Sequence, residues 1–276
     1  MVSAAEDTPM AGMGAAHRAW SRHSPRERWT RYAVTLLIGL AAYWSIYNID
    51  IDPEWVMDAP VQIADLFIRM SPPDMSRLPS IASAIVETLN IATIATVLGV
   101  LVSMPVAWLA AQNTTPNRAT LWLGRVILVS SRSVNTIIWA LLFVAIFGPG
   151  ALAGIIAIMF RSIGFLGKLM SEAIEEINRA PIEALEAVGA SRMKIILYGI
   201  IPQVVPTFVA VTILRWDINL RESTVLGLVG AGGIGLILQG SIDTFAWQTV
   251  STILLAIIAM VVAGEALAAW LRNKVM

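Results

Sequence analysis

Long apolar segments recur along this chain and restrict its fold more than any other feature. A helix needs about 20 apolar residues to cross the hydrocarbon core of a bilayer. Hydrophobic residues make up 57% of the chain and charged residues only 14%, whereas about 25% of the residues of a soluble protein are charged. The sequence therefore predicts an all-α integral membrane protein with six transmembrane helices. We place them at about residues 32–48, 83–111, 125–147, 151–170, 204–223 and 249–270.

The distribution of Lys and Arg predicts the orientation of the chain, because cytoplasmic loops carry an excess of these residues. Basic residues cluster before the first span and return after the second, the fourth and the sixth spans. The Gly148–Gly150 turn and residues 236–248 contain none, and residues 48–80 are predominantly acidic. We expect both termini in the cytoplasm. We also expect a flexible cytoplasmic tail over residues 1–30 and a transmembrane domain over residues 31–276 with a cytoplasmic loop at about 171–202.

This loop interrupts the apolar pattern with a short charged segment that has the signals of a helix. Pro181 suits the first turn, and Glu183 lies near the positive end of the helix dipole. Ile182, Leu185 and Val188 form an apolar stripe, and Gly189 suits the left-handed residue past a helix end. We expect Ser191 to cap a second helix from Arg192 to about Ile201, before Pro202 opens the next span. A short amphipathic helix of this kind can dock in the groove of a soluble partner.

The segment resembles the EAA loop of permeases of ABC importers, which reads Glu-Ala-Ala, three residues, Gly, nine residues, Ile, any residue, Leu-Pro. Glu183, Ala184, Gly189 and Pro202 stand at the matching positions. Leu185, Gly199 and Ile201 depart from the pattern. In that family the loop is the coupling helix, which docks into a cleft of the ATP-binding subunit. The resemblance assigns ATPase coupling to Pro181, Glu183, Ala184, Leu185, Gly189, Ala190 and Pro202.

Within this family the chain is most similar to the permease of phosphonate importers. The similarity rests on SEAIEEINRAPIEALEAVGASRMKIILYGIIPQVVP, which starts at Ser171, and on LRWDINLRESTVLGLVGAGGIG, which starts at Leu214. It implies a type I importer permease in the inner membrane that carries phosphonate or a related small phosphorus oxyanion. Permeases for methionine share this architecture, so methionine, phosphate and phosphite stay open as substrates. A stand-alone secondary carrier is the alternative from a different class.

The resemblance also implies partners. They are two copies of an ATP-binding subunit that bind MgATP, an extracytoplasmic substrate-binding protein, and a second permease, which is either an identical copy or a paralogue. The net charge of zero gives no reason to expect a nucleic acid partner. The chain has no cysteine, and its two histidines, His17 and His23, lie in the expected tail. We therefore expect no catalytic site, metal site or cofactor in the chain itself.

Several polar residues fall inside the predicted spans, where ionisable groups are costly and usually face a cavity or one another. The spacing allows an Asp217–Arg221 ion pair within one helix, which would be a structural role. Alternatively, Arg215 and Arg221 could contact an anionic substrate. Snorkelling is the simpler account for Lys168 and Arg132. The candidates for the translocation path are Arg132, Asn135, Arg161, Arg215, Asn219 and Arg221.

A glycine-rich run follows the fifth span and formally matches the G-x-G-x-x-G pattern of dinucleotide-binding sites. That motif requires a preceding strand and a βαβ unit, and neither is indicated here. A bend at which backbones approach closely explains the glycines better. The family resemblance implies a gate-adjacent or re-entrant element, to which we assign Gly227, Gly230, Gly232, Gly233 and Gly235.

Overall fold

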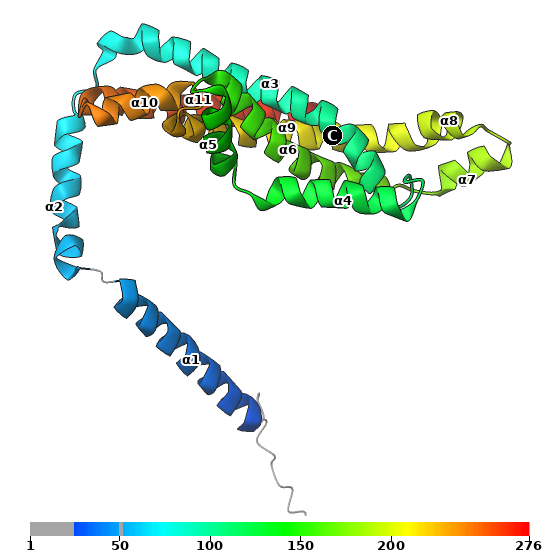
Figure 1. The fold of residues 1–276 in the computed structure, drawn as a ribbon, viewed down its shortest axis with the longest axis horizontal. Coiled ribbons are helices and arrows are strands. Elements are labelled where there is room, and N and C mark those ends of the chain that lie inside the picture. Colours follow the sequence, from blue (N-terminus) through cyan, green and yellow to red (C-terminus); the bar gives the residue numbers. More distant parts are fainter. Residues whose placement is uncertain (1–24, 50–51, 276) are drawn as a thin grey trace, which may run out of the picture. The chain divides into compact units, whose positions relative to one another are not determined.

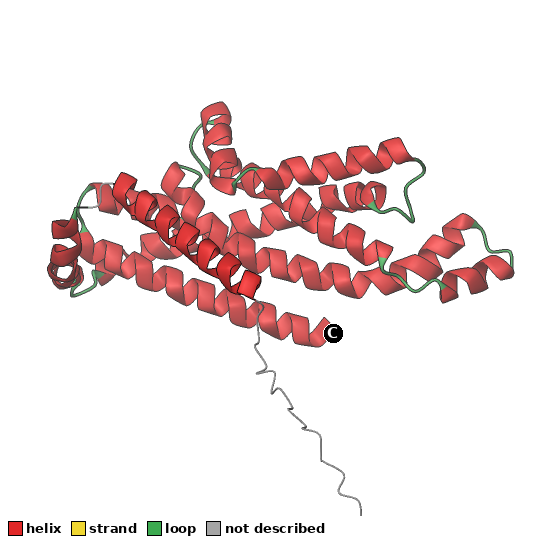
Figure 2. Ribbon diagram, turned by 90° about the horizontal axis from the view of Figure 1, so that it is seen from below, coloured by secondary structure: helices red, strands yellow, loops and turns green. Residues whose placement is uncertain are grey.

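The computed structural model describes residues 25–49 and 52–275, and the regular elements in these ranges are all helical (Figure 2). Most of the expected tail, residues 1–24, lies outside the described residues. Helix α1, Pro25–Ile49, already contains residues 25–30, so the predicted tail boundary at residue 30 is too late. Contacts divide the chain into residues 1–62, which contain α1, and residues 63–276, which contain the helices from α3 onward.

The helices are labelled in chain order (Figure 1). After α1 come α2 (Pro53–Met70), a 3-10 turn (Met75–Arg77), α3 (Leu78–Ala110), α4 (Arg118–Ser133), α5 (Thr136–Phe147) and α6 (Ala151–Glu175). They are followed by α7 (Ala180–Ala187), α8 (Arg192–Lys194), a π-helical segment (Ile195–Ile200) and α9 (Ile201–Leu226). A 3-10 turn (Gly227–Val229), α10 (Ile234–Asp243) and α11 (Trp247–Val275) complete the chain.

The helices that are long and apolar enough to cross a membrane confirm the all-α membrane fold. Five helical runs among the described residues meet this condition, and a bent pair brings the number to six. The runs are Arg26–Ile49, Met75–Ala110, Ala151–Glu175, Arg192–Asp243 and Trp247–Lys274. Helix α6 continues to Glu175, so the loop predicted from residue 171 begins one turn later.

The predicted third span at 125–147 is wrong as a single helix, because α4 and α5 meet at 89°. Val134 is extended between them, and the Asn135 side chain accepts a hydrogen bond from the backbone N–H of Ile137 at 3.0 Å. An asparagine in this position caps the start of a new helix. Hydropathy did not reveal the break, because apolar residues lie on both sides of it.

Helices α3 and α6 form the centre of the 63–276 unit and contact most of the other helices in it. Their contact surfaces are rich in small residues, which let helix backbones approach closely in a membrane. Ala92, Ala95 and Ala157 are completely buried, and Gly99 lies directly against Ser162. Large apolar side chains cover the outside of the same helices, as at Leu101, which is 60% exposed. These exposed apolar surfaces fit a lipid environment.

The glycine-rich run forms a tight turn between α9 and α10. Gly230, Gly232 and Gly233 have φ values of +87°, +82° and +72°, a region that favours glycine. A side chain on Gly235 would collide with the backbone of Gly227 and with the Thr224 carbonyl. The run is therefore a close backbone approach, as the sequence indicated, and its role as a gate stays a prediction.

Helix α3 holds this turn from the side. The backbone N–H of Gly233 donates to the carboxylate of Glu87 at 3.1 Å, and that of Ile234 donates to the Thr88 hydroxyl at 2.8 Å. These bonds satisfy two of the free N–H groups at the start of α10. Side chains that are distant in sequence therefore fix the entry of α10 into the bundle.

We predict that Gly235→Ala destabilises the protein by about 1–3 kcal/mol, the usual cost of inserting an atom into a packed core. The added Cβ would collide with backbone atoms that cannot move aside. Thermal unfolding in detergent measures the loss. Gly240→Ala is the matched control on α10, because nothing lies within 4 Å of its added Cβ. Equal melting temperatures for the two variants would contradict the close approach.

Candidate functional site

The loop predicted to couple to an ATPase contains helix α7, which projects with α8 from one end of the bundle (Figure 1). Pro181 lies in the first turn of α7, where its missing N–H costs no hydrogen bond. Glu183 also lies in the first turn, at the positive end of the helix dipole. The predicted short helix and both of its start signals are therefore present.

Gly189 ends α7 in the left-handed conformation that the sequence indicated, with a φ of +73°. Its N–H donates to the Glu186 carbonyl at 2.9 Å, and the N–H of Ala190 donates to the Leu185 carbonyl at 3.0 Å. This pair of bonds is a Schellman motif, which reverses the chain after a helix. The reversal directs the chain back toward α9.

The predicted apolar stripe on α7 is only partly correct. Ile182 and Leu185 face the bundle and would each lie 3.3 Å from a Cβ added to Gly199. Val188 follows the last helical residue and is 78% exposed, because the helix ends before this residue can join the stripe. Gly199, where the sequence departs from the family pattern, thus provides the close contact between the π-helical segment and α7.

One detail of the predicted second helix is wrong. Ser191 has the extended backbone of a cap, but its side chain makes no capping hydrogen bond. As predicted, Pro202 lies in the first turn of the next helix, α9, and the π-helical segment Ile195–Ile200 joins α8 to α9 without a break. Ile201 separates this segment of wider helical turn from Pro202, which cannot donate a hydrogen bond. Helix α8 and the fifth span are therefore parts of one continuous helical rod, and the turn at Gly189 separates α7 from it.

Gln203 ties the two ends of the coupling segment together. Its side-chain oxygen accepts a bond from the N–H of Asn178 at 2.9 Å, and its amide nitrogen donates to the carbonyls of Asn178 at 3.2 Å and Gly199 at 2.6 Å. Asn178 precedes α7 and Gln203 lies in the first turn of α9, so these bonds connect the start of the coupling loop to α9. Sequence analysis missed Gln203, since its partners are backbone groups and those of Asn178 lie 25 residues away.

A cavity of about 360 Å³ lies beside α7. Its wall contains both apolar and charged side chains. Helix α7 forms one side of the cavity, and the loop after α3 forms another. The lining includes Trp108, Asn113, Ile182, Glu183, Glu186 and Arg192.

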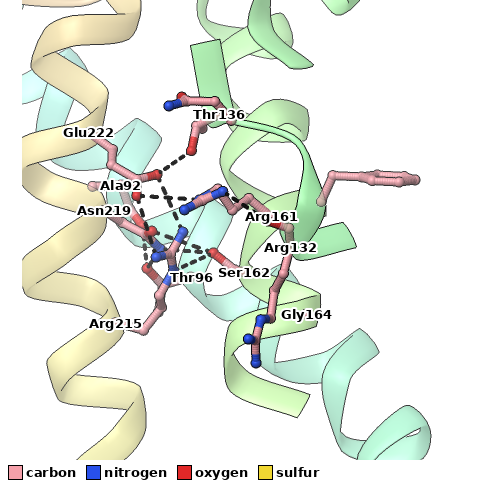
Figure 3. Close-up of polar contacts among 12 residues, drawn as sticks. Ala92, Thr96, Arg132, Thr136, Arg161, Ser162, Gly164, Arg215, Asn219 and Glu222 are labelled. Atoms are coloured by element: carbon pink, nitrogen blue, oxygen red, sulfur yellow. Dashed lines mark hydrogen bonds and ion pairs between the residues drawn. The ribbon is translucent and has the colours of Figure 1, made fainter. Parts of the chain in front are cut away.

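A second group of predicted site residues meets at the centre of the bundle (Figure 3). Arg215 on α9 is 2% exposed, and its Nε donates to the Ser162 hydroxyl on α6 at 2.9 Å. Asn219, one turn further along α9, donates to the hydroxyl of Thr96 on α3 at 2.8 Å. These contacts join α3, α6 and α9 through a network of polar groups, which we call the buried cluster; it also includes Glu222.

Glu222 supplies the negative charge of the buried cluster. Its carboxylate lies 3.3 Å from the guanidinium of Arg215 and 3.9 Å from that of Arg161. It also accepts a hydrogen bond from the hydroxyl of Thr136, at the start of α5, at 2.9 Å. A buried arginine without an anion is strongly unfavourable, so Glu222 compensates Arg215. A carboxylate within an apolar span is the sequence signal of such a group.

Arg161 also stabilises the break between α4 and α5. Its guanidinium donates to the carbonyl of Val134 at 2.9 Å and to that of Arg132 at 3.4 Å. Helix-ending carbonyls of this kind lack intrahelical partners. Arg161 therefore links the bent pair to Glu222 on α9.

The remaining path candidates do not join the buried cluster. Arg221 forms an ion pair with Asp217 at 2.5 Å, which confirms the predicted pair within one helix. Asn135 caps α5. The Arg132 side chain points away from Glu222, toward Gly164 (Figure 3). Among the described residues, no three His, Asp or Glu side chains are grouped to hold a metal ion.

The model of the family described as binding-protein-dependent transport system inner membrane component matches residues 103–276. The phosphite transport system permease protein PtxC of Stutzerimonas stutzeri is 40% identical over 87% of this chain and 87% of its own length. The putative phosphite transport system permease protein HtxC of the same organism is 38% identical over 91% of this chain and 88% of its own length.

A further relative and one solved structure extend the comparison. The phosphate-import permease protein PhnE of Mycolicibacterium smegmatis is 34% identical over 92% of this chain and 48% of its own length. An inward-facing structure of the MetNI methionine ABC transporter matches 74% of this chain and 99% of its own chain, with a TM-score of 0.63 and 22% identity. At that identity the structure supports the fold alone.

We predict that Glu222→Gln lowers the free energy of unfolding by about 3 kcal/mol, because it leaves Arg215 buried without a counter-charge. Thermal unfolding in detergent reports this loss. Glu172→Gln is the control, since it breaks the Lys168–Glu172 pair on the exposed side of α6, for which the cost is about 1 kcal/mol or less. The double variant Arg215→Met/Glu222→Leu should recover part of the loss. An unchanged melting temperature for Glu222→Gln would contradict the compensation.

Proposed function

Because this chain belongs to the family of binding-protein-dependent transport system inner membrane components, and is thus a permease subunit of an ABC importer, we propose that it carries a small phosphorus oxyanion. Phosphonate, phosphite and phosphate share a tetrahedral phosphorus centre with anionic oxygens. The observation that carries the proposal is the similarity over about nine tenths of the chain to permeases named for phosphite and phosphate. Family membership removes the stand-alone carrier that the sequence left open.

The same family membership supports the proposed partners. An ATP-binding subunit in two copies would bind MgATP and dock on α7, and a substrate-binding protein would deliver the oxyanion from the other side. A second permease, identical or paralogous, would complete the passage. The exposed face of α7 supports the docking surface, because Glu183 and Ala184 have no cover there. The permease itself hydrolyses nothing in this scheme.

The charge distribution supports an orientation with α7 in the cytoplasm of the cell and both chain ends on the same side. Arg179, Arg192 and Lys194 flank α7, and Arg272 and Lys274 end α11. The Gly148–Gly150 turn, at the other side of the bundle, carries no charge. Localisation in the inner membrane agrees with the family description.

The continuous rod from α8 to α9 supports a mechanism for coupling. Closure of two ATP-bound subunits would move α7, and the bonds of Gln203 would pass that movement to α9. The same helix carries Arg215 and Glu222 in its second half and ends at the glycine-rich turn. We propose that the movement of α9 opens the passage alternately to each side of the membrane.

The assay that tests this function is ATP hydrolysis by the complex in nanodiscs. The chain is co-expressed with its ATP-binding subunit and mixed with the binding protein and phosphonate, phosphite, phosphate or methionine. We expect one of the phosphorus compounds to stimulate hydrolysis. Stimulation by methionine alone would overturn the substrate class, and failure to form any complex with an ATP-binding subunit would overturn the coupling role.

We predict that Gly189→Val separates ATP hydrolysis from uptake or releases the ATP-binding subunit. Valine is strained at a φ of +73°, so the Schellman motif that sets the direction of α7 would be lost. Co-purification and uptake in proteoliposomes are measured together. Gly189→Asn is the matched variant, because asparagine tolerates the left-handed region and should keep most of the uptake. Normal uptake by Gly189→Val would refute the role of this residue.

A further inference from the structure

A cavity of about 260 Å³ between α4 and α6, separate from the buried cluster, has more basic than acidic side chains in its wall. Arg125, Arg132, Lys168 and the single carboxylate of Glu175 line it, together with Leu128 and Val129. The volume is smaller than that of pockets for drug-sized ligands, which begin at about 300 Å³. It suits a compact group with few atoms.

The basic residues form a ladder along the cavity. On α4, Arg125 and Arg132 are seven residues apart, so they share one face and lie about 10 Å apart along the axis. Lys168 projects from the facing helix α6. The two helices touch closely, because a Cβ on Gly164 would collide with Arg132 and with the Leu128 carbonyl. The position of the ladder is therefore fixed by rigid elements.

Two of the three basic residues are compensated within the chain. Arg125 pairs with Glu175 at 3.2 Å, and Lys168 pairs with Glu172 at 2.8 Å. In the part of the chain that the structure describes, the Arg132 guanidinium has neither a carboxylate nor a hydrogen-bond acceptor. The cavity thus keeps one positive charge without a counter-ion. A charge of this kind within a membrane helix usually finds an anion or water.

We propose that this cavity binds a phosphoryl anion, with Arg132 as its main contact and Lys168 and Arg125 as supporting charges. The guanidinium fork matches two phosphoryl oxygens, and a lysine adds a point charge. Two sources share this chemistry, the headgroup of an anionic phospholipid and a free phosphorus oxyanion. Only the second source rests on the proposed function.

The surroundings make both sources accessible. Trp122 and Val129 on α4 are 73% and 63% exposed, and tryptophan is enriched where helices meet the membrane surface. Basic pockets between membrane helices are known sites for lipid headgroups. The ladder also extends from the break at Ser133 toward the end of the bundle that carries α7. A free anion can therefore follow it along α4.

Two binding measurements on the full-length chain in nanodiscs test the site without requiring transport. In the first, the discs contain equal phosphatidylglycerol and phosphatidylcholine, and native mass spectrometry counts the lipids that remain bound. In the second, the discs contain phosphatidylcholine alone, and equilibrium binding of radiolabelled inorganic phosphate is measured. Arg132→Gln and Lys168→Gln are the test variants, and Arg118→Gln, on α4 but outside the cavity, is the control.

We expect Arg132→Gln to reduce anion binding about tenfold in one of the two measurements, with a smaller loss for Lys168→Gln and none for Arg118→Gln. A loss in the first measurement identifies the lipid headgroup as the ligand, and a loss in the second identifies the free oxyanion. Binding that is equal in wild type, Arg132→Gln and Lys168→Gln in both measurements overturns the site. Because no ATPase is involved, that result would leave the importer function standing.

Discussion

The carboxylate of Glu222 is the contact on which the centre of the bundle depends. Arg215 is almost fully buried beside it, and Arg161 reaches it from α6 while holding the carbonyls at the end of α4. Thr136 brings the start of α5 to the same carboxylate. One acidic side chain thus connects α9 with the start of α5 directly and with the end of α4 through Arg161. A buried charge needs an opposite charge nearby, so this pairing stabilises the centre of the bundle.

Helix α9 connects the parts of the molecule that the proposed transport requires. Gln203 binds the coupling segment at its first turn, and Arg215 and Glu222 belong to the buried cluster further along. The glycine-rich turn follows its last residue, where α3 holds the start of α10 through Glu87 and Thr88. In the proposed coupling, a displacement at α7 would act on one continuous helix that reaches the core and the turn. The π-helical segment beside Gly199 is the place where this rod departs from regular α-helix.

The arginines in the predicted spans fall into two kinds, those with a carboxylate partner in this chain and those without one. Arg215, Arg161 and Arg221 each have a carboxylate within 4 Å in this chain, so their charges have a structural account. Arg132 has none among the described residues and lines a basic cavity instead. The sequence placed all four in one group of path candidates. The structure distinguishes them because it shows which carboxylates each guanidinium can reach.

The sequence by itself determined the features that depend on neighbours in the chain. Apolar runs of sufficient length specify the helices, Pro181 and Gly189 specify the start and end of α7, and the spacing of Asp217 and Arg221 allows their ion pair. Only the tertiary structure decided the break at Asn135, the pairing of Glu222 with two arginines and the contacts of Gln203. A capping side chain contributes little to an average hydropathy, and the partners of Glu222 and Gln203 come from other helices. Local periodicity records which face a residue occupies, whereas packing decides what lies opposite that face.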